Sequence, residues 1–167
     1  MYYRDDTGVF DAPLDVVWAF LSRTPEHREA HGHRNNRFEW VDDQHFRAGW
    51  EQDLWGGEET LGMRGHVLPP LALAYEIVEG ALEGSKFLFY YTPEGPRTRV
   101  TLVGQFVSSR IPAGELEEKV RALFDREFAE DEAALRTYLD RTHGPGAASE
   151  RARDPTTGTP PPPATQH

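Results

Sequence analysis

The longest periodic segment of the sequence, residues 115–139, constrains the fold more than any other feature. Its apolar residues recur every three or four positions, which is the pattern of one face of an amphipathic α-helix. They are Leu116, Val120, Leu123, Phe124, Phe128, Leu135 and Tyr138. At 1.5 Å per residue this helix is about 37 Å long, so its apolar face needs a broad partner surface.

The segment before this helix predicts that partner surface, because its apolar residues alternate with polar ones as they do along half-buried strands. The alternation and the turns between its runs predict strands at 37–41, 44–54, 60–67, 72–79, 86–92 and 98–107. Gly56-Gly57 is typical of a two-residue hairpin turn, which needs positive φ at both positions. Strands that follow one another through short turns form an antiparallel sheet.

The start of the chain predicts one more strand and two short helices. Residues 1–10 form the strand, and Asp11 before Pro13 signals the start of a helix over 13–22. A second helix begins near Thr24-Pro25 and ends at Gly32. This order predicts an α+β fold in which a curved antiparallel β-sheet wraps around a long C-terminal helix. Because one helix cannot fill the concave side of such a sheet, we expect a cavity between them.

Composition limits the partners that this chain can have. It contains 18 basic and 28 acidic residues among 167, a formal net charge of −10, and no cysteine. The charge argues against nucleic acid and against an anionic membrane surface as a partner. No apolar run approaches the ~20 residues that span a bilayer, and no secretory signal is visible. We therefore expect a cytoplasmic protein with no nucleic-acid partner and no stable membrane insertion; the sequence defines no protein partner.

Residues 143–167 differ from the rest, because they contain no large apolar residue. They cannot bury enough apolar surface to offset the entropy lost on ordering. We therefore predict a ligand-binding domain over residues 1–142 and a disordered Pro-rich tail over 143–167. The alternative is a docking segment for a partner's aromatic groove, for which the run of four prolines is short.

Several short motifs in the first 140 residues resemble one family. They are Phe10-Asp11-Ala12-Pro13, Val17-Trp18, Val67-Leu68-Pro69-Pro70, Ala74-Tyr75-Glu76, Thr92-Pro93-Glu94-Gly95 and Thr98-Arg99-Val100-Thr101-Leu102. With the long final helix, their order resembles the START-related (SRPBCC) superfamily in its polyketide-cyclase-like branch. The resemblance implies a helix-grip fold. That superfamily includes lipid carriers, ligand sensors, cyclases and dehydratases, so the resemblance alone does not define a function.

The expected cavity suggests that the chain binds or transports a small hydrophobic ligand, aromatic or lipid-like. Ligand pockets are mostly apolar and aromatic, with a few polar groups. We predict that the lining is supplied by Trp50, Met63, Tyr75, Phe89, Tyr91, Phe106 and Phe124. The alternative is that these residues fill a closed core. The register of strand 86–92 is also open, because Phe87, Phe89 and Tyr91 alternate with Leu88 and Tyr90.

Two carboxylates lie within the apolar face of the long helix. At 100° per residue, Glu127 and Asp131 fall about 20° and 60° from Leu116, near the centre of the apolar stripe. They are therefore the predicted polar anchor for the ligand. The candidates to pair with them are Arg47, Arg64, His66 and Arg99. Otherwise the two carboxylates reach a wet cavity, or the helix end projects past the sheet and solvent surrounds them; we favour this last interpretation.

If these carboxylates were buried as a like-charge pair, desolvation and repulsion would raise the pKa of one of them. Such a group, with Tyr91 or His66, suits the acid–base steps of a polyketide cyclase or dehydratase, which is the alternative enzymatic function. The sequence assigns no catalytic residue. A third alternative is a protein-interaction module that uses the acidic helix or the tail.

A metal site is the remaining chemical possibility. His27 and His31 are four residues apart on one predicted helix, a spacing that can chelate a transition metal. However, the chain has no H-E-x-x-H motif, and histidines near a helix end are common on protein surfaces. We therefore assign no metal and no cofactor from the sequence. Nucleophilic catalysis has no support either, because no serine stands in a G-x-S-x-G motif.

Overall fold

The computed structural model describes residues 1–23 and 25–143 of the chain. The tail predicted from residue 143 onward therefore lies, apart from that first residue, outside the described residues. The elements are β1 (Tyr2–Asp5), β2 (Val9–Phe10), α1 (Leu14–Arg23), α2 (Pro25–Glu29), β3 (Arg34–Trp40), β4 (His45–Leu54), β5 (Gly57–Leu68), β6 (Ala72–Glu79), β7 (Lys86–Glu94), β8 (Arg97–Gln105) and α3 (Ala113–His143). Within the described part of the chain, no helix is both long and apolar enough to span a membrane.

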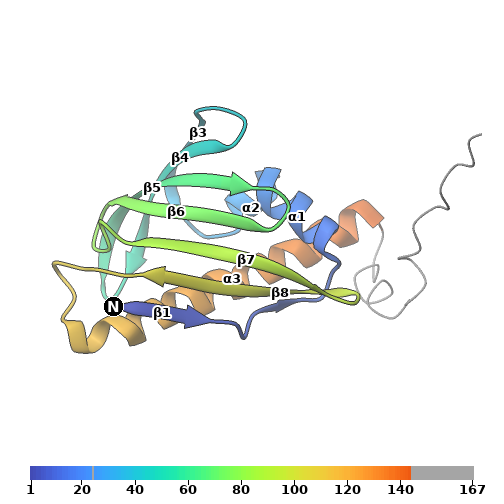
Figure 1. Ribbon diagram of the computed structural model, residues 1–167. Coiled ribbons are helices and arrows are strands. Elements are labelled where there is room, and N and C mark those ends of the chain that lie inside the picture. Colours follow the sequence, from blue (N-terminus) through green and yellow to red (C-terminus); the bar gives the residue numbers. More distant parts are fainter. Residues whose placement is uncertain (24, 144–167) are drawn as a thin grey trace, which may run out of the picture.

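The strands form one antiparallel sheet in the order β1-β8-β7-β6-β5-β4-β3, and β2 also pairs with β8. Helix α3 runs along one side of this curved sheet, and α1 and α2 lie beside its C-terminal half (Figure 1). The predicted α+β fold is thus confirmed, with a long C-terminal helix held by an antiparallel sheet. The strand predicted over residues 1–10 is divided in two, since β1 and β2 are separate elements.

The hairpin between β4 and β5 differs from the prediction by one residue. Its turn consists of Trp55 and Gly56, with φ angles of 52° and 90°, and not of Gly56-Gly57. Leu54 pairs with Gly57, so Gly57 is already the first residue of β5. The turn still has positive φ at both positions, but a tryptophan adopts one of them. The register is set by the inward apolar side chains of both strands, which a one-residue slip would turn outward.

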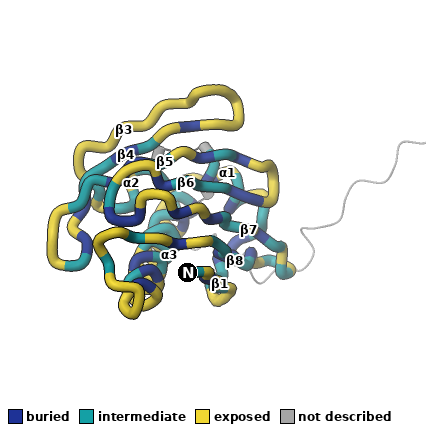
Figure 2. The backbone as a smooth tube through the Cα atoms, turned by 60° about the vertical axis from the view of Figure 1, so that its left-hand side comes forward, coloured by how far each residue is buried: buried dark blue, intermediate teal, exposed yellow. Residues whose placement is uncertain are grey.

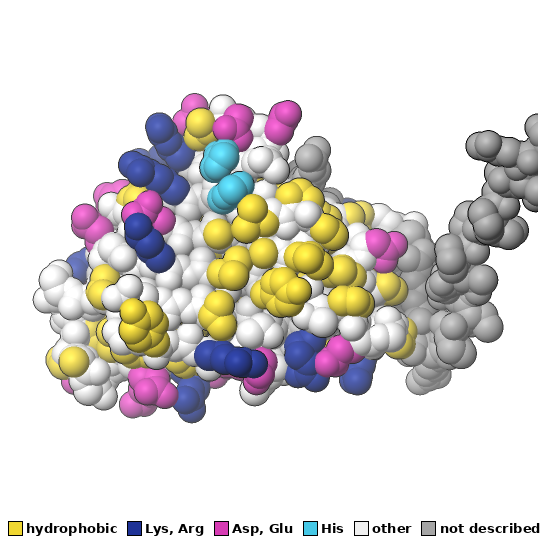
Figure 3. All heavy atoms as spheres, viewed as in Figure 1, with side chains coloured by type: hydrophobic (Ala, Val, Ile, Leu, Met, Phe, Trp, Pro, Cys, Tyr) yellow, Lys and Arg dark blue, Asp and Glu magenta, His cyan; other side chains and the backbone are white. Residues whose placement is uncertain are grey.

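The register of β7, which the sequence left open, is now defined. Phe87 and Tyr91 are buried on the concave side, and Tyr90 is exposed on the convex side. Figure 3 shows that hydrophobic side chains also gather on this outer face. The exposed large apolar residues of the described chain are Tyr2, Phe38, Trp40, Val41, Leu68, Leu71, Val78, Tyr90 and Val107.

The concave side contains two separate hydrophobic cores. The first core surrounds α1 and includes Phe10, Val17, Phe20, Leu21, Leu135 and Leu139. The second core lies at the other end of α3 and includes Leu82, Phe87, Leu102, Phe106, Leu116 and Val120. Tyr75 and Phe89 pack against both cores. The middle of α3 therefore faces the space between the two cores.

Candidate ligand cavity and its histidine–carboxylate cluster

A cavity of about 350 Å³ lies between the sheet and α3. Eight of the nine predicted site residues border it: Trp50, Met63, Tyr75, Phe89, Tyr91, Phe124, Glu127 and Asp131. They come from β4, β5, β6, β7 and the middle of α3, because inward positions alternate along strands and recur by turns along the helix. The volume falls within the range of ~300–1,000 Å³ that is usual for small-molecule sites.

Phe106, the ninth predicted residue, does not border the cavity. Its side chain is fully buried, and its ring lies 5.5 Å from that of Phe87 and 5.6 Å from that of Phe124. It belongs to the second core, so the structure does not place it among the residues that border the cavity. The residue follows the end of β8, where the N-terminal half of α3 already fills the space above the sheet.

The outer end of the cavity lies between α2 and β3. All residues of β3 are exposed, as Figure 2 shows, yet Arg37, Phe38 and Trp40 are among those that border the cavity. The guanidinium carbon of Arg28 lies 4.6 Å from the centre of the Phe38 ring, a cation–π contact from α2 to β3. The cavity therefore reaches the surface beside this contact, which we call the mouth.

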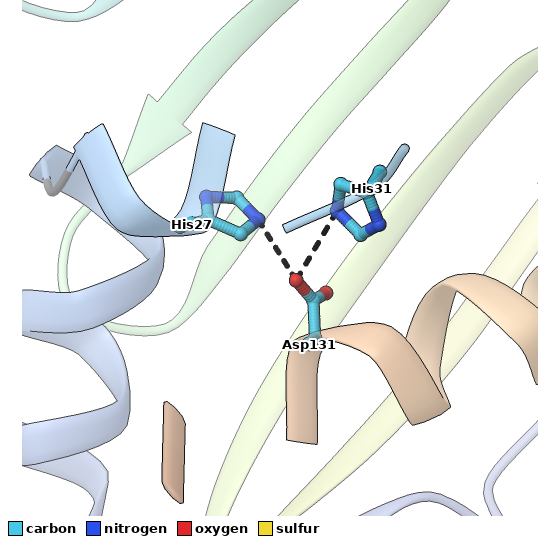
Figure 4. A group of neighbouring side chains, drawn as sticks. All are labelled: His27, His31 and Asp131. Atoms are coloured by element: carbon cyan, nitrogen blue, oxygen red, sulfur yellow. Dashed lines mark ion pairs between the residues drawn. The ribbon is translucent and has the colours of Figure 1, made fainter. Parts of the chain in front are cut away.

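The inner wall near α2 carries a cluster of histidines and carboxylates. Asp131 Oδ1 lies 3.3 Å from His27 Nε2 and 3.2 Å from His31 Nε2 (Figure 4). His31 Nδ1 is 3.0 Å from Glu127 Oε2 and 3.0 Å from Glu130 Oε2. The members of this histidine–carboxylate cluster are His27, His31, His33, Glu127, Glu130 and Asp131. All but Glu130 border the cavity.

These contacts correct the prediction for the two carboxylates. The side chains of Glu127 and Asp131 are each 18% exposed, so neither projects into bulk water at a free helix end. The arginines expected to pair with these two carboxylates do not do so. Arg47 and Arg64 are exposed, and Arg99 pairs with Glu94. His66 stacks on His45 at 4.2 Å and does not border the cavity, so it cannot serve there as an acid or base.

The histidines also reverse the expected pKa shifts. Burial alone would raise the pKa of Asp131, but its interactions with the imidazoles of His27 and His31 outweigh burial and lower that pKa to about 2. Burial is likewise outweighed for Glu127, whose pKa is lowered by His33 and His31. For His31, burial lowers the pKa, but Asp131, Glu127 and Glu130 raise it to about 9. Both acids are therefore ionised at neutral pH, and His31 is protonated.

Several buried polar atoms beside the cavity have no hydrogen-bond partner among the described residues. They are Trp50 Nε1, Gln52 Nε2, His33 Nε2 and Asp131 Oδ1. The first two are donors, and the His33 ring stacks on Trp50 with centroids 4.4 Å apart. Since more than nine in ten buried polar groups in proteins are paired, these atoms are where a bound molecule or ion would make polar contacts.

Sequence reasoning missed the histidine half of the cluster. His27 lies in α2, which ends at Glu29 and not near Gly32 as predicted, and His31 and His33 lie in the segment that follows it. A usable signal was present, because His27 and His31 lie four residues apart and so do Glu127 and Asp131. These complementary pairs could have suggested that the two segments meet. What the sequence did not contain was the direction in which the five-residue α2 leaves α1 and meets α3.

No family model and no curated protein matches this chain. Solved structures do match it. The Zhui aromatase/cyclase from a Streptomyces species is 16% identical, with 84% of this chain and 94% of that chain covered and a TM-score of 0.65. A START superfamily protein from Mycobacterium smegmatis is 9% identical, with 82% and 98% covered and a TM-score of 0.66. The chain has the helix-grip fold. The protein Ara h 8.0201 shares this fold, at 10% identity, 82% and 98% coverage and a TM-score of 0.65. The predicted resemblance to START-related and polyketide-cyclase-like proteins is thus confirmed at the level of the fold.

Proposed function

We propose that this protein binds a small hydrophobic molecule in the cavity between the sheet and α3. The observation that carries the proposal is a cavity of about 350 Å³ whose lining is mostly apolar and aromatic. Such a lining gains free energy when a ligand displaces water from it, roughly 25 cal/mol for each Å² of apolar surface that is buried. The fold neighbours include an aromatase/cyclase and a START superfamily protein, which is consistent with a role in ligand binding.

The polar atoms around the cavity suggest the ligand class. Trp50 Nε1 and Gln52 Nε2 are buried donors without a partner among the described residues, so they favour a ligand that carries acceptor oxygens. Burial raises the pKa of Tyr75 and of Tyr91, so both hydroxyls stay neutral and also able to donate. We therefore propose a compact aromatic molecule with a carbonyl or hydroxyl group directed at Trp50 and Gln52.

A pair of matched substitutions tests this proposal. Ala48 borders the cavity from β4, whereas Ala74 lies on the convex face of β6, opposite Leu88 of β7. In the Ala48→Phe protein, a ring would occupy the cavity, and we expect the affinity for a naphthalene-based fluorescent probe to fall at least tenfold. Ala74→Phe should leave the affinity for the probe within about twofold of that of the unaltered protein. Equal effects of the two changes, or no saturable probe binding by the unaltered chain, would refute the proposed site.

A second candidate function is cyclisation with loss of water, as in a polyketide cyclase or dehydratase. It is favoured by one observation, namely that ionised Asp131 and protonated His31 lie together at the wall of the cavity. An aldol cyclisation needs a base to remove a proton beside a carbonyl and an acid to protonate the departing oxygen, and the water leaves with that proton. Incubation with a linear poly-β-ketone thioester, followed by mass spectrometry, would reveal a product lighter by one water. The His31→Asn protein should bind the fluorescent probe but form no such product.

The interaction-module alternative predicted a filled interior together with an exposed apolar patch. The cavity disagrees with a filled interior, but exposed apolar residues do lie on the convex face of the sheet, among them Leu68, Val78 and Tyr90. An interaction role for this face or for the tail stays a prediction.

A further inference from the structure

The histidine–carboxylate cluster has the spacing of a metal site. Zinc–nitrogen bonds are about 2.0–2.1 Å long, so two ligand atoms of a tetrahedral zinc ion lie about 3.3–3.4 Å apart. Asp131 Oδ1 lies 3.3 Å from His27 Nε2 and 3.2 Å from His31 Nε2, which matches that separation. One ligand atom from each of the three residues lies within 4.8 Å of the others.

Two buried atoms of the cluster have no hydrogen-bond partner among the described residues. Asp131 Oδ1 is buried and has no hydrogen-bond partner of acceptable geometry among the described residues, although two imidazole nitrogens are near it. His33, whose side chain is only 7% exposed, also has a buried Nε2 without a hydrogen bond to any described residue, although Glu127 Oε1 lies 3.7 Å away. Buried polar atoms that converge without bonding one another are what a bound cation would complete.

The other nitrogen of His31 is already oriented for this role. His31 Nδ1 lies 3.0 Å from Glu130 Oε2 in a hydrogen bond and equally close to Glu127 Oε2. Metal-binding histidines usually donate one ring N–H to a carboxylate, which fixes the tautomer and directs the lone pair of the other nitrogen at the metal. With Nδ1–H donated to Glu130, His31 Nε2 is the atom that faces Asp131.

The local charge also favours a divalent cation. Glu127, Glu130 and Asp131 bring three carboxylates together, and the guanidinium of Arg126 lies 3.2 Å from Glu127 Oε1. A divalent cation bound among these carboxylates would offset part of their negative charge. Its ligands would be two nitrogens and one oxygen, a set that suits Zn²⁺ rather than Mg²⁺ or Ca²⁺.

We propose that His27, His31 and Asp131 form a binding site for a Zn²⁺-class transition-metal ion in the wall of the cavity. Because all three residues border the cavity, the fourth coordination position would face it, as in zinc sites that keep one position for water or a substrate. The site would thus place a Lewis acid beside the ligand proposed above, yet metal binding itself does not depend on that ligand.

Calorimetric titration tests the site on the full chain without a polyhistidine tag. After treatment with EDTA and dialysis, ZnCl₂ should bind with one-to-one stoichiometry. Both His27→Ala and Asp131→Asn should weaken binding at least about tenfold. The matched control is the double change His45→Ala with His66→Ala, which removes the stacked histidine pair on the outer face. It should leave the affinity within about twofold, and MgCl₂ should give no binding.

The unaltered protein gives a second readout, in case a variant does not fold. In NMR spectra of the histidine side chains, one equivalent of Zn²⁺ should shift the ring signals of His27 and His31 and leave those of His45 and His66 in place. Binding that is lost only with the outer pair would identify an adventitious surface site. That outcome, or the absence of one-to-one binding, would overturn the proposal without touching the probe-binding result for the cavity.

Discussion

The protonation of His31 makes a specific prediction about stability. Its side chain is 11% exposed, and the neighbouring carboxylates raise its pKa from 6.5 to about 9. A group whose pKa is higher in the folded state stabilises that state most below its unfolded pKa, and the contribution is lost as the pH rises through the folded pKa. At 1.36 kcal/mol for each pKa unit, the free energy of unfolding should therefore fall by about 3 kcal/mol between about pH 6.5 and 9.

Urea unfolding in the presence of EDTA, followed by tryptophan fluorescence, measures this change. The midpoint should decrease steadily over the interval for the unaltered protein. His31→Asn removes the titrating ring, so the variant should be less stable near pH 6 but almost insensitive to pH up to 9. His45→Asn is the control, because the His45 side chain is 48% exposed and its ion pair is with the exposed Asp42.

The two variants separate this explanation from a general effect of alkaline pH. If His31→Asn lost as much stability as the unaltered protein over the same interval, the proton would not reside on His31 and our account of the cluster would be wrong. A decrease well under 1 kcal/mol in the unaltered protein would have the same meaning.

Three further predictions concern the cavity and its surroundings. Arg28→Ala removes the cation–π contact beside the mouth, so a bound probe should dissociate several-fold faster in stopped-flow experiments while stability changes by less than about 1 kcal/mol. Gly65→Ala would place a methyl carbon 2.0 Å from the buried ring of Phe46, so the free energy of unfolding in urea should fall by about 1–3 kcal/mol. Phe106→Leu should cost about 1–2 kcal/mol but leave probe affinity within twofold, because Phe106 lies outside the cavity.

Each of these predictions has a result that contradicts it. An unchanged dissociation rate would mean that Arg28 does not restrict the mouth. Gly57→Ala is the control for Gly65→Ala, since no described residue other than the chain neighbours of Gly57 lies within 4 Å of the added carbon. Equal losses in the two would contradict the steric explanation. A large loss of probe affinity in the Phe106→Leu protein would indicate that Phe106 does contribute to the ligand site.

The sequence predicted the parts of the fold that depend on local spacing. The three- and four-residue period located α3, and the alternation along residues 44–54 correctly turned Phe46 and Trp50 inward. These periods are properties of the backbone, so one segment is enough to define which face is apolar. Eight of the nine predicted site residues border the cavity for that reason.

What the sequence could not supply depends on how distant segments meet. His31 and Asp131 are one hundred positions apart, and the approach of α2 and the residues after it to α3 brings them into contact. The helical period placed Asp131 on the apolar face but carried no information about its partner, so the side chain was expected in water. The same gap explains the wrong pKa direction, because a carboxylate facing histidines behaves opposite to one facing another carboxylate.

The division of the interior into two cores has a mechanical consequence. Among the described side chains, Tyr75 and Phe89 are the ones that pack against both cores. A ligand bound in the space between the two cores would connect them, since it would contact side chains that otherwise move with separate halves of the molecule. Occupancy should therefore slow amide hydrogen exchange in α1 and α2 together with the opposite end of α3, so that the two ends loosen as one unit and no longer independently.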